Sequence, residues 1–460
     1  MMDPMASEET RTLNSTTTGG PAAGDAREPG KDAAPGRPAA RAWTPWTTRL
    51  LVLGIVLAAL NLRPAITSLG ALLEEVRDGL GMSGSVAGLL TSVPPLCFAV
   101  FGVTAPRLAR RFGPGAIVCA GMAAITAGLL IRPYAGGTAG FLAASALALM
   151  GIAVSNVLMP VIVKRYFPDR VGSMTGLYSM ALALGTSVAA AATVPLTDAM
   201  GGDWQPGLAV WAVLGAAAVL PWIPFVRNRE APSTQDASAS TAAPASADAA
   251  PGPETAGTDG QDGRPALRIT RSRTAWALAV FFGLQATAAY ITMGWAAQIF
   301  RDAGVSAGTA GLLLAVIMVM GVPLAFVIPR VATRLPQQGP IVVVLGLCGL
   351  AGYAGLYLAP AGGAWAWALL LGISNCAFPL ALTMVGMRAR TGAGVVQLSA
   401  FAQSTGYLIS IPGPLLVGVL YQHSGGWGLP IALMAALMVP QMIVGVLAGR
   451  DRTVEEEAAR

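Results

Sequence analysis

Twelve long apolar runs dominate this sequence of 460 residues. A helix needs about 20 apolar residues to cross a hydrocarbon core about 30 Å thick, whereas membrane β-strands are shorter and alternate in polarity. Only 11% of the residues are charged, compared with roughly 25% in soluble domains. The sequence therefore predicts an all-α membrane protein with twelve transmembrane helices. The expected spans are residues 49–74, 84–106, 114–132, 138–163, 170–196, 206–226, 274–300, 307–329, 339–359, 363–386, 393–420 and 427–449.

A long polar segment interrupts the apolar runs in the middle of the chain. Residues 227–272 are rich in Ala, Ser, Pro and Asp and cannot bury a core, so we expect a flexible cytoplasmic linker there. Six expected spans lie on each side of it, within residues 49–226 and 273–449. Repeated motifs predict two six-helix bundles related by pseudo-two-fold symmetry. The motifs recur in the same order: AGLL (87–90 and 310–313), PRLARR and PRVATR (106–111 and 329–334), and SNVLMP and SNCAFP (155–160 and 374–379).

The positive charges favour one orientation in the membrane. Residues 1–48, rich in Gly, Pro and Ala, are expected to form a disordered cytoplasmic tail, and residues 450–460 a short cytoplasmic tail. With both termini in the cytoplasm, the charges follow the positive-inside rule. The net charge of +6 is then explained by topology, and we expect no nucleic-acid partner. The Lys and Arg residues that do not lie on the cytoplasmic side are Arg63, Arg77, Arg132 and Arg301.

Arg63 is a charged residue within the first expected span, in the segment NLRPAITS (61–68). A charge at the bilayer centre costs about 2.5–3.5 kcal/mol, so such residues usually face a bundle interior or a water-filled cavity. Pro64 disfavours helical backbone at Arg63, so we expect the helix to bend or loosen there. Asn61 and Thr67 lie near the same level and are candidate cavity residues with Arg63.

The spans offer Arg63 no obvious carboxylate partner. Asp and Glu occur only at or beyond the expected span ends, and a buried cation normally needs a partner. One interpretation is that the planar guanidinium, with its five donors, binds an anionic solute. The other is that Arg63 bonds backbone carbonyls and fixes the kink, or extends to the membrane surface.

The repeated SNxxxP motif places an amide near a proline in each half. A proline four residues after the asparagine frees the backbone carbonyl of Asn156 in the first half and of Asn375 in the second. An unpaired carbonyl is costly in lipid. Each site therefore either faces a cavity or forms a kink whose free carbonyl is bound by a neighbouring helix.

Further polar residues recur around these sites. Each alone suits an interhelical hydrogen bond as well as a ligand contact, but their presence in six different spans favours a shared central cavity. In the eleventh span, Ser399, Gln403 and Tyr407 follow a spacing of i, i+4 and i+8, which places them along one helix face. The additional candidates are Tyr178, Gln285, Tyr290, Trp295, Gln403 and Tyr407.

Arginines cluster at the cytoplasmic ends of two helices. They either serve only to orient the chain, or cap helix C-termini and pair across the halves in one conformational state. We treat them as candidate gating residues. They are Arg107, Arg110, Arg111, Arg330 and Arg334.

The residues of common catalytic and metal sites are sparse. The four cysteines lack CxxC spacing, the chain has one histidine, and no HExxH, P-loop or Ser/His/Asp set is present. We therefore expect no metal, no cofactor and no enzymatic activity.

Twelve helices in two repeats around a basic linker resemble the major facilitator superfamily. The segment LARRFG (108–113) resembles its loop signature, with Arg110 in place of the usual acidic residue. More specifically, NLRPAITSLGALL, AGLLTSVPPLCFAVFGVTAPRLARRFG, SNVLMP, GLQ followed by Tyr290 and Trp295, and FAQSTGYLIS resemble the cyanate permease and 2-nitroimidazole transporter family. The resemblance implies a bacterial inner-membrane secondary transporter of small, often anionic or heteroaromatic solutes. It also implies that Arg63 binds an anion and that the amide and aromatic candidates line the cavity.

The resulting functional prediction is transport of a cyanate-like or nitroimidazole-like solute by alternating access around a site at the membrane midplane. Drug or metabolite efflux through a broader pocket of the same fold is the alternative. The expected partners are the solute and the lipid bilayer, and we expect a monomer. A coupling proton is left open, because the only histidine, His423, lies in a loop.

Overall fold

The computed structural model describes residues 45–226 and 269–458. Across these two ranges the regular structure is helical throughout. Twelve segments are long and apolar enough to cross a membrane, which confirms the all-α fold predicted from the apolar runs. Most of the expected N-terminal tail and linker lies outside the described residues.

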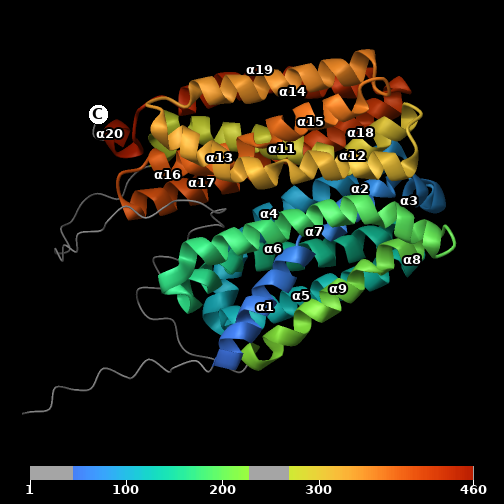
Figure 1. Ribbon diagram of the computed structural model, residues 1–460, viewed down its shortest axis with the longest axis horizontal. Helices are drawn as coiled ribbons and strands as arrows, with labels where there is room; N and C mark the ends of the chain where they lie inside the picture. Colours follow the sequence, from blue (N-terminus) through green and yellow to red (C-terminus); the bar gives the residue numbers. More distant parts are fainter. Residues whose placement is uncertain (1–44, 227–268, 459–460) are drawn as a thin grey trace, which may run out of the picture. The chain divides into compact units, whose positions relative to one another are not determined.

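The helices of the first half form one group (Figure 1, blue to green). The first span begins at Pro45, slightly before the expected start at residue 49. A 3₁₀ helix, η3, completes the sixth span. The elements are α1 (Pro45–Asn61), α2 (Pro64–Ala71), α3 (Leu73–Leu80), α4 (Gly84–Phe112), α5 (Pro114–Ile131), η1 (Arg132–Tyr134), α6 (Thr138–Tyr166), η2 (Pro168–Arg170), α7 (Val171–Ala199), α8 (Trp204–Ala209), α9 (Trp211–Val219) and η3 (Leu220–Val226).

The helices of the second half form the other group (Figure 1, yellow to red). The expected C-terminal tail contains a short helix, α20, which packs against α11. The elements are η4 (Ile269–Arg271), α11 (Arg273–Asp302), α12 (Ala307–Val319), α13 (Gly321–Arg334), α14 (Gly339–Leu358), α15 (Ala364–Asn375), α16 (Ala377–Met387), α17 (Gly392–Ser410), α18 (Pro412–Ser424), α19 (Gly428–Ala448) and α20 (Val454–Ala458).

The first span is broken at the predicted position. Helix α1 ends at Asn61 and α2 begins at Pro64, with Arg63 immediately before it at φ −123° and ψ −26°. Pro64 occupies the first helical position, where its missing N–H is not needed. The break places the side chain of Arg63 at an interruption of the helix rather than within a regular turn.

The two SNxxxP motifs have different backbones. In the first half, Pro160 lies inside the continuous helix α6. In the second half, α15 ends at Asn375 and α16 begins at Ala377, so the helix is interrupted before Pro379. The repeated motif therefore leaves one span continuous and interrupts the other.

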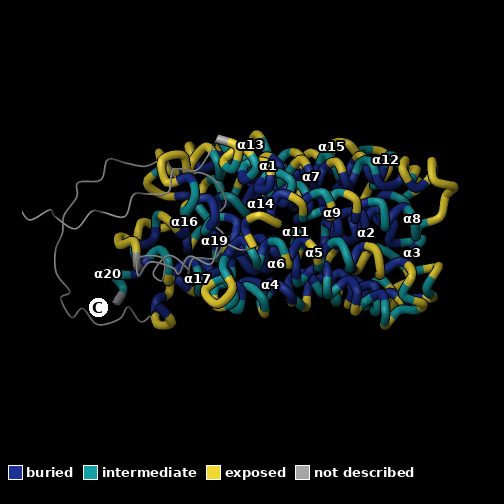
Figure 2. The backbone as a smooth tube through the Cα atoms, turned by 90° about the horizontal axis from the view of Figure 1, so that it is seen from below, coloured by how far each residue is buried: buried dark blue, intermediate teal, exposed yellow. Residues whose placement is uncertain are grey.

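Apolar side chains cover both the interior and the outer faces of the helices. Leu184, Val213 and Leu358 are among the exposed large hydrophobic residues, as helices in contact with lipid require. In Figure 2, the buried parts of the backbone trace lie mainly in the interior of the helical region, and the exposed parts lie mainly along its borders.

The two halves meet through glycines that allow close backbone contact. Helix α2 packs on α11, α4 on α18 and α7 on α12. A Cβ atom added at Gly70 would lie 2.0 Å from the carbonyl oxygen of Met293, and one at Gly418 would lie 2.3 Å from that of Gly84. A Cβ atom at Gly311 would lie 2.6 Å from the carbonyl oxygen of Ala190. We call these contacts the glycine seam.

Candidate functional site

A central cavity of about 210 Å³ is lined by helices of both halves. Arg63, which precedes α2, reaches it from the first half together with residues of α6 and α7. From the second half, α11, α12, α13, α15, α16 and α17 contribute. Seven of the eleven candidate substrate-binding residues line this cavity. They are Arg63, Asn156, Tyr178, Tyr290, Asn375, Gln403 and Tyr407.

Arg63 is half-buried in the cavity wall. Three tyrosines, Tyr178, Tyr290 and Tyr407, line the same cavity as Arg63. Within residues 45–226 and 269–458, no Asp or Glu forms an ion pair with it. The polar groups that line the cavity with Arg63 are therefore uncharged.

The two repeated asparagines both use their amide oxygens within the protein. Tyr178 donates a hydrogen bond to Oδ1 of Asn156. Gln285 donates to the backbone oxygen of Asn375 at 3.0 Å and to its Oδ1 at 3.1 Å. Since the oxygens are occupied, the NH₂ groups of Asn156 and Asn375 remain as donors for a ligand.

Gln285 is the hydrogen-bond partner of the free backbone carbonyl of Asn375 in the second half. The carbonyl of Asn375 that Pro379 leaves unpaired accepts its hydrogen bond from α11, a neighbouring helix. Gln441 of α19 in turn donates to Oε1 of Gln285 at 2.7 Å. Of the two interpretations of the motif, a carbonyl bound by a neighbouring helix holds at Asn375, while its amide still lines the cavity.

Aromatic rings form part of the cavity and its surroundings. Phe98 stacks on Tyr407 with ring centroids 5.2 Å apart. Phe282 contacts Tyr407 edge-on at 5.3 Å and Phe378 at 5.3 Å. Flat faces of this kind pack well against a planar ligand.

Four candidates do not line the cavity. Asn61 is fully buried and its amide contacts the sulfur of Met122. Thr67 donates to the backbone oxygen of Arg63. Asn61 ends α1, on the other side of the break from Arg63. Thr67 lies one turn after Arg63 in α2, but its side chain is fully buried and bonds back to the helix instead of facing the cavity.

The remaining two candidates, Gln285 and Trp295, lie behind or beyond the wall. Gln285 supports Asn375 from behind, as described above. Trp295 donates to the hydroxyl of Thr91 at 3.1 Å and packs edge-on against Trp427 at 5.7 Å. Both side chains are used in contacts between helices, the alternative role that such polar residues offer.

Sequence reasoning missed Arg132 as an interior residue. It was expected on the outer side, at the end of the third expected span, but it is only 2% exposed. Its Nη1 donates to the backbone oxygen of Ala65 at 2.9 Å and its Nη2 to the hydroxyl of Ser68 at 3.3 Å. Arg132, rather than Arg63, thus binds a backbone carbonyl beside the kink. Gln441 was also missed, although it is a lone polar residue in an apolar span.

Arg330 bonds back to its own helix. Its guanidinium group donates to the backbone oxygen of Phe326, one turn earlier in α13, at 3.3 Å, so capping of the helix C-terminus stays a prediction. At the end of α4, Arg111 lies over the ring of Phe112, 5.2 Å from its centroid. Pairing of the arginine clusters across the halves stays a prediction.

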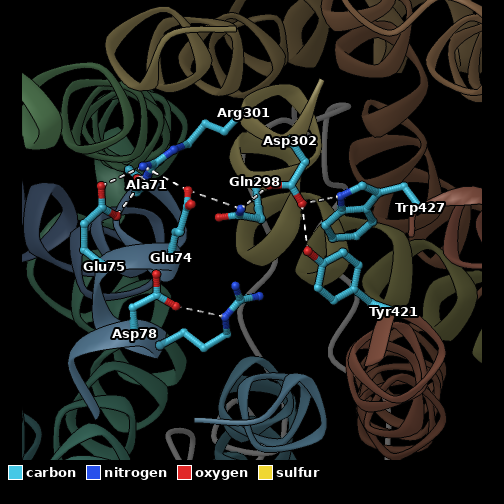
Figure 3. Close-up of polar contacts among 10 residues, drawn as sticks. Ala71, Glu74, Glu75, Asp78, Gln298, Arg301, Asp302, Tyr421 and Trp427 are labelled. Carbon is cyan, nitrogen blue, oxygen red and sulfur yellow. Dashed lines mark hydrogen bonds and ion pairs between the residues drawn. The ribbon is translucent and has the colours of Figure 1, made fainter. Parts of the chain in front are cut away.

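A polar cluster joins the halves at the junction of α2 and α3 with α11 (Figure 3). Arg301 forms two hydrogen bonds with Glu75, at 2.9 and 2.8 Å, and an ion pair with Glu74 at 3.0 Å. Gln298 also donates to Glu74. We call Glu74, Glu75, Gln298 and Arg301 the Arg301 cluster. Together with the glycine seam, it holds the halves together on this side of the cavity.

Asp302 extends the cluster toward the last spans. Its carboxylate accepts hydrogen bonds from Tyr421 at 2.9 Å and from Trp427 at 2.7 Å (Figure 3). On the same side of the cavity, a further contact joins the two halves: the Gln422 side chain accepts a hydrogen bond from the hydroxyl of Ser85 at 2.7 Å. These contacts link α4, α11, α18 and the start of α19.

Comparison with known proteins places this architecture in a family. The family model described as "Major Facilitator Superfamily" matches residues 51–411. Among solved structures, the D-xylose-proton symporter has a TM-score of 0.63 at 12% identity, over 88% of this chain and 96% of that one. A mutant of the nucleoside transporter NupG has a TM-score of 0.65 at 11% identity, over 86% and 99%. These structures share the fold.

Curated relatives are more similar in sequence. "Uncharacterized transporter YycB" of Bacillus subtilis (strain 168) is 33% identical over 410 residues, covering 88% of this chain and 94% of that one. The "2-nitroimidazole transporter" of Escherichia coli (strain K12) is 32% identical over 412 residues, covering 88% and 96%. "Cyanate transport protein CynX" of the same strain is 29% identical over 395 residues, covering 86% and 96%. The chain therefore belongs to the Major Facilitator Superfamily.

Proposed function

We propose that this protein transports a small anionic or flat heteroaromatic solute across the bacterial inner membrane by alternating access. The observation that carries the proposal is the charge of Arg63, which faces the central cavity without a carboxylate partner in the described part of the chain. A buried guanidinium group needs a counter-charge. A bound anion would supply it during each transport cycle.

The polar groups of the cavity support this choice. Because the amide oxygens of Asn156 and Asn375 accept hydrogen bonds from Tyr178 and Gln285, the amides present their N–H donors. Donors beside a guanidinium group suit a carboxylate, cyanate, nitrate or nitro group. Gln403 donates to Ser399 and keeps its oxygen as an acceptor, which suits a ring N–H.

The volume of the cavity limits the size of the solute. A dry cavity of about 150 Å³ binds benzene in an engineered protein. About 210 Å³ therefore accommodates one ring with a small substituent. This size favours a small solute over the alternative of a broad efflux pocket. It also agrees with the names of two relatives, a 2-nitroimidazole transporter and a cyanate transport protein.

The conformational cycle follows from the contacts between the halves. In the proposed orientation both termini are cytoplasmic, and the glycine seam and the Arg301 cluster close the outer side. Opening the cavity outward would separate α2 from α11 and break the pairs between Arg301 and the two glutamates. The two bundles would then rock around the central site.

Thermal unfolding of the detergent-purified protein tests the proposal. The ligand panel contains cyanate, nitrate, short carboxylates and 2-nitroimidazole, because a ligand that binds the native state raises its stability by mass action. We expect an anion to stabilise the wild type and to lose this effect in Arg63→Gln. The exposed Arg330→Gln variant is the matched control and should keep it. If only neutral compounds stabilised the protein, and stabilised the wild type and Arg63→Gln equally, the proposal that the solute is an anion would be wrong.

A flux assay then tests transport itself. Proteoliposomes loaded with the stabilising compound should exchange it with labelled compound outside, and Arg63→Gln should not. Repeating the assay with an imposed pH gradient tests the coupling proton, since a proton-coupled carrier accumulates solute against its gradient and a uniporter does not. Absence of exchange in the wild type, with every compound that binds, would contradict a transport function.

A further inference from the structure

A second cavity, of about 20 Å³, lies next to the central one. Tyr290 lines both cavities. The small cavity is also bounded by Arg132 and Ser145 and by the glycine seam at Gly70. A cavity needs about 10–15 Å³ to hold a water molecule, so this one accommodates a single water or a single ion of similar size.

Two buried polar atoms at this cavity lack partners. Arg132 is 2% exposed and Ser145 is 1% exposed. Among the described residues, Nε of Arg132 and Oγ of Ser145 have no hydrogen-bond partner. Two of the five N–H donors of Arg132 bind Ala65 and Ser68, and Nε is the guanidinium nitrogen that has no partner among the described residues. Buried polar groups are nearly always satisfied.

The charge of Arg132 is also unbalanced. Its guanidinium group lies 6.0 Å from the ring centroid of Phe141, but it has no ion pair with any Asp or Glu of residues 45–226 or 269–458. Other arginines do have such partners: Arg301 pairs with Glu74 and Glu75, and the buried Arg388 lies 3.6 Å from Asp451. A buried charge without a counter-charge is strongly unfavourable.

A water molecule would satisfy this site poorly. The N–H of Arg132 needs an acceptor, and a water that accepts from it must place its own two hydrogens. Most of the remaining wall is apolar, including Leu69, Leu90 and Leu149. A water could accept from Nε of Arg132 and donate to the hydroxyl oxygen of Ser145, but it carries no charge. It would leave the buried guanidinium group without a counter-charge.

We propose that the small cavity binds one monovalent anion of halide size, which in the cell is chloride. The anion accepts hydrogen bonds from Nε of Arg132 and from the hydroxyl of Ser145. It neutralises the guanidinium group that binds the kink between α1 and α2. This site is separate from the solute cavity and goes beyond the proposed transport function.

Anomalous diffraction and thermal unfolding test this site in the full chain. Crystals grown in sodium bromide should show an anomalous peak between Arg132 and Ser145. In solution, chloride or bromide should raise the unfolding temperature saturably relative to gluconate at constant ionic strength, because a ligand bound to the native state stabilises it. Ser145→Ala removes a ligand donor without touching the bonds of Arg132. It should shift the halide midpoint at least tenfold.

Two control variants distinguish this site from halide binding elsewhere in the protein. Ser155 is a second buried serine of α6 whose hydroxyl has no partner, and it does not line the small cavity. Ser155→Ala should leave the halide midpoint unchanged, as should Arg63→Gln in the solute cavity. Water density without an anomalous signal would overturn the halide site. So would a halide effect that Ser145→Ala leaves intact or that Arg63→Gln abolishes, since the ion would then lie elsewhere.

Discussion

Arg63 and Arg132 are the same side chain in two different settings. Both come from the first half, and in the described residues neither has an ion pair with a carboxylate. Arg63 is half-buried at a cavity of about 210 Å³, whereas Arg132 is 2% exposed at one of about 20 Å³. Arg132 uses two of its nitrogens on backbone and side-chain acceptors of α2.

The difference shows how an arginine that the protein itself binds differs from one that it leaves open to a large cavity. Charge alone does not distinguish the two arginines. What distinguishes them is the number of donors that the protein uses and the space that remains. Tyr290, which lines both cavities, marks the border between the two settings.

The largest expected effect is on stability at Arg132. Arg132→Gln removes the hydrogen bonds to Ala65 and Ser68, and hydrogen bonds to charged groups contribute about 1.5–3 kcal/mol each. We expect the free energy of unfolding to fall by about 3 kcal/mol. Denaturation in mixed micelles would measure it. Arg63→Gln should cost less than about 1 kcal/mol in the same assay. If the two variants were equally unstable, the comparison between the arginines would fail.

The next effect is on affinity at Arg63. Once a stabilising anion is known, Arg63→Gln should weaken its binding by about 30-fold, equivalent to about 2 kcal/mol for a lost charge-assisted contact. Arg63→Lys keeps the charge but not the planar fork, so it should bind with intermediate affinity. Titration calorimetry measures both. Wild-type affinity in Arg63→Gln would show that the anion does not contact this residue.

A smaller effect is expected where the small cavity meets the glycine seam. A Cβ atom at Gly70 would lie 2.0 Å from the carbonyl oxygen of Met293, so Gly70→Ala must push α2 and α11 apart at a cost of at least about 1 kcal/mol. Spin labels at the exposed Asp78 and His423 should report a longer distance across this side. Gly172→Ala, where an added Cβ meets nothing within 4 Å, is the control. An unchanged distance would mean that the seam does not set the opening.

The smallest effect comes from a carboxylate outside the spans. Burial alone would raise the pKa of Glu457, but hydrogen bonds from Ser272 and Thr274 hold its pKa below the ordinary value of 4.5. Its ionised form therefore stabilises the contact of α20 with α11 above the unfolded-state pKa, and this contribution is lost as the pH falls through the lower folded-state pKa. The effect should stay below about 1 kcal/mol, because the group is half-exposed and screened by water.

Unfolding curves for wild type and Glu457→Gln measure this contribution between about pH 3 and about pH 7, a window that includes the ordinary pKa of a carboxyl group. The two curves should differ at the upper end of the window and converge in acid. For Arg63→Gln and Arg132→Gln, we expect no such convergence with the wild-type curve in acid. A pH-independent difference would assign the role of Glu457 to packing instead of charge.

Much of the fold followed from local sequence. Long apolar runs predicted the twelve spans, and Pro64 predicted the break after Asn61, because both signals are carried by neighbouring residues. The interruption at Cys376 was expected only as a kink, and the same motif leaves α6 continuous around Pro160. The motif alone therefore does not determine whether a helix is interrupted.

The candidate site was predicted in part. Residues beside a proline or in a repeated motif, such as Arg63, Asn156 and Asn375, do line one cavity. The misplaced residues depend on distant contacts. Arg132 meets Ala65 across 67 positions, and Gln441 meets Gln285 across 156. No periodicity within one span carries that information.

The glycine seam has a consequence for how often the carrier can turn over. Glycines bring two backbones together without interlocking side chains, so parting them exposes little new apolar surface. The closed and open arrangements can therefore lie close in free energy. A solute shifts such an equilibrium only by its difference in affinity for the two states. A contact that is close in geometry but weak in energy allows a small difference in ligand affinity to shift the balance between the two arrangements.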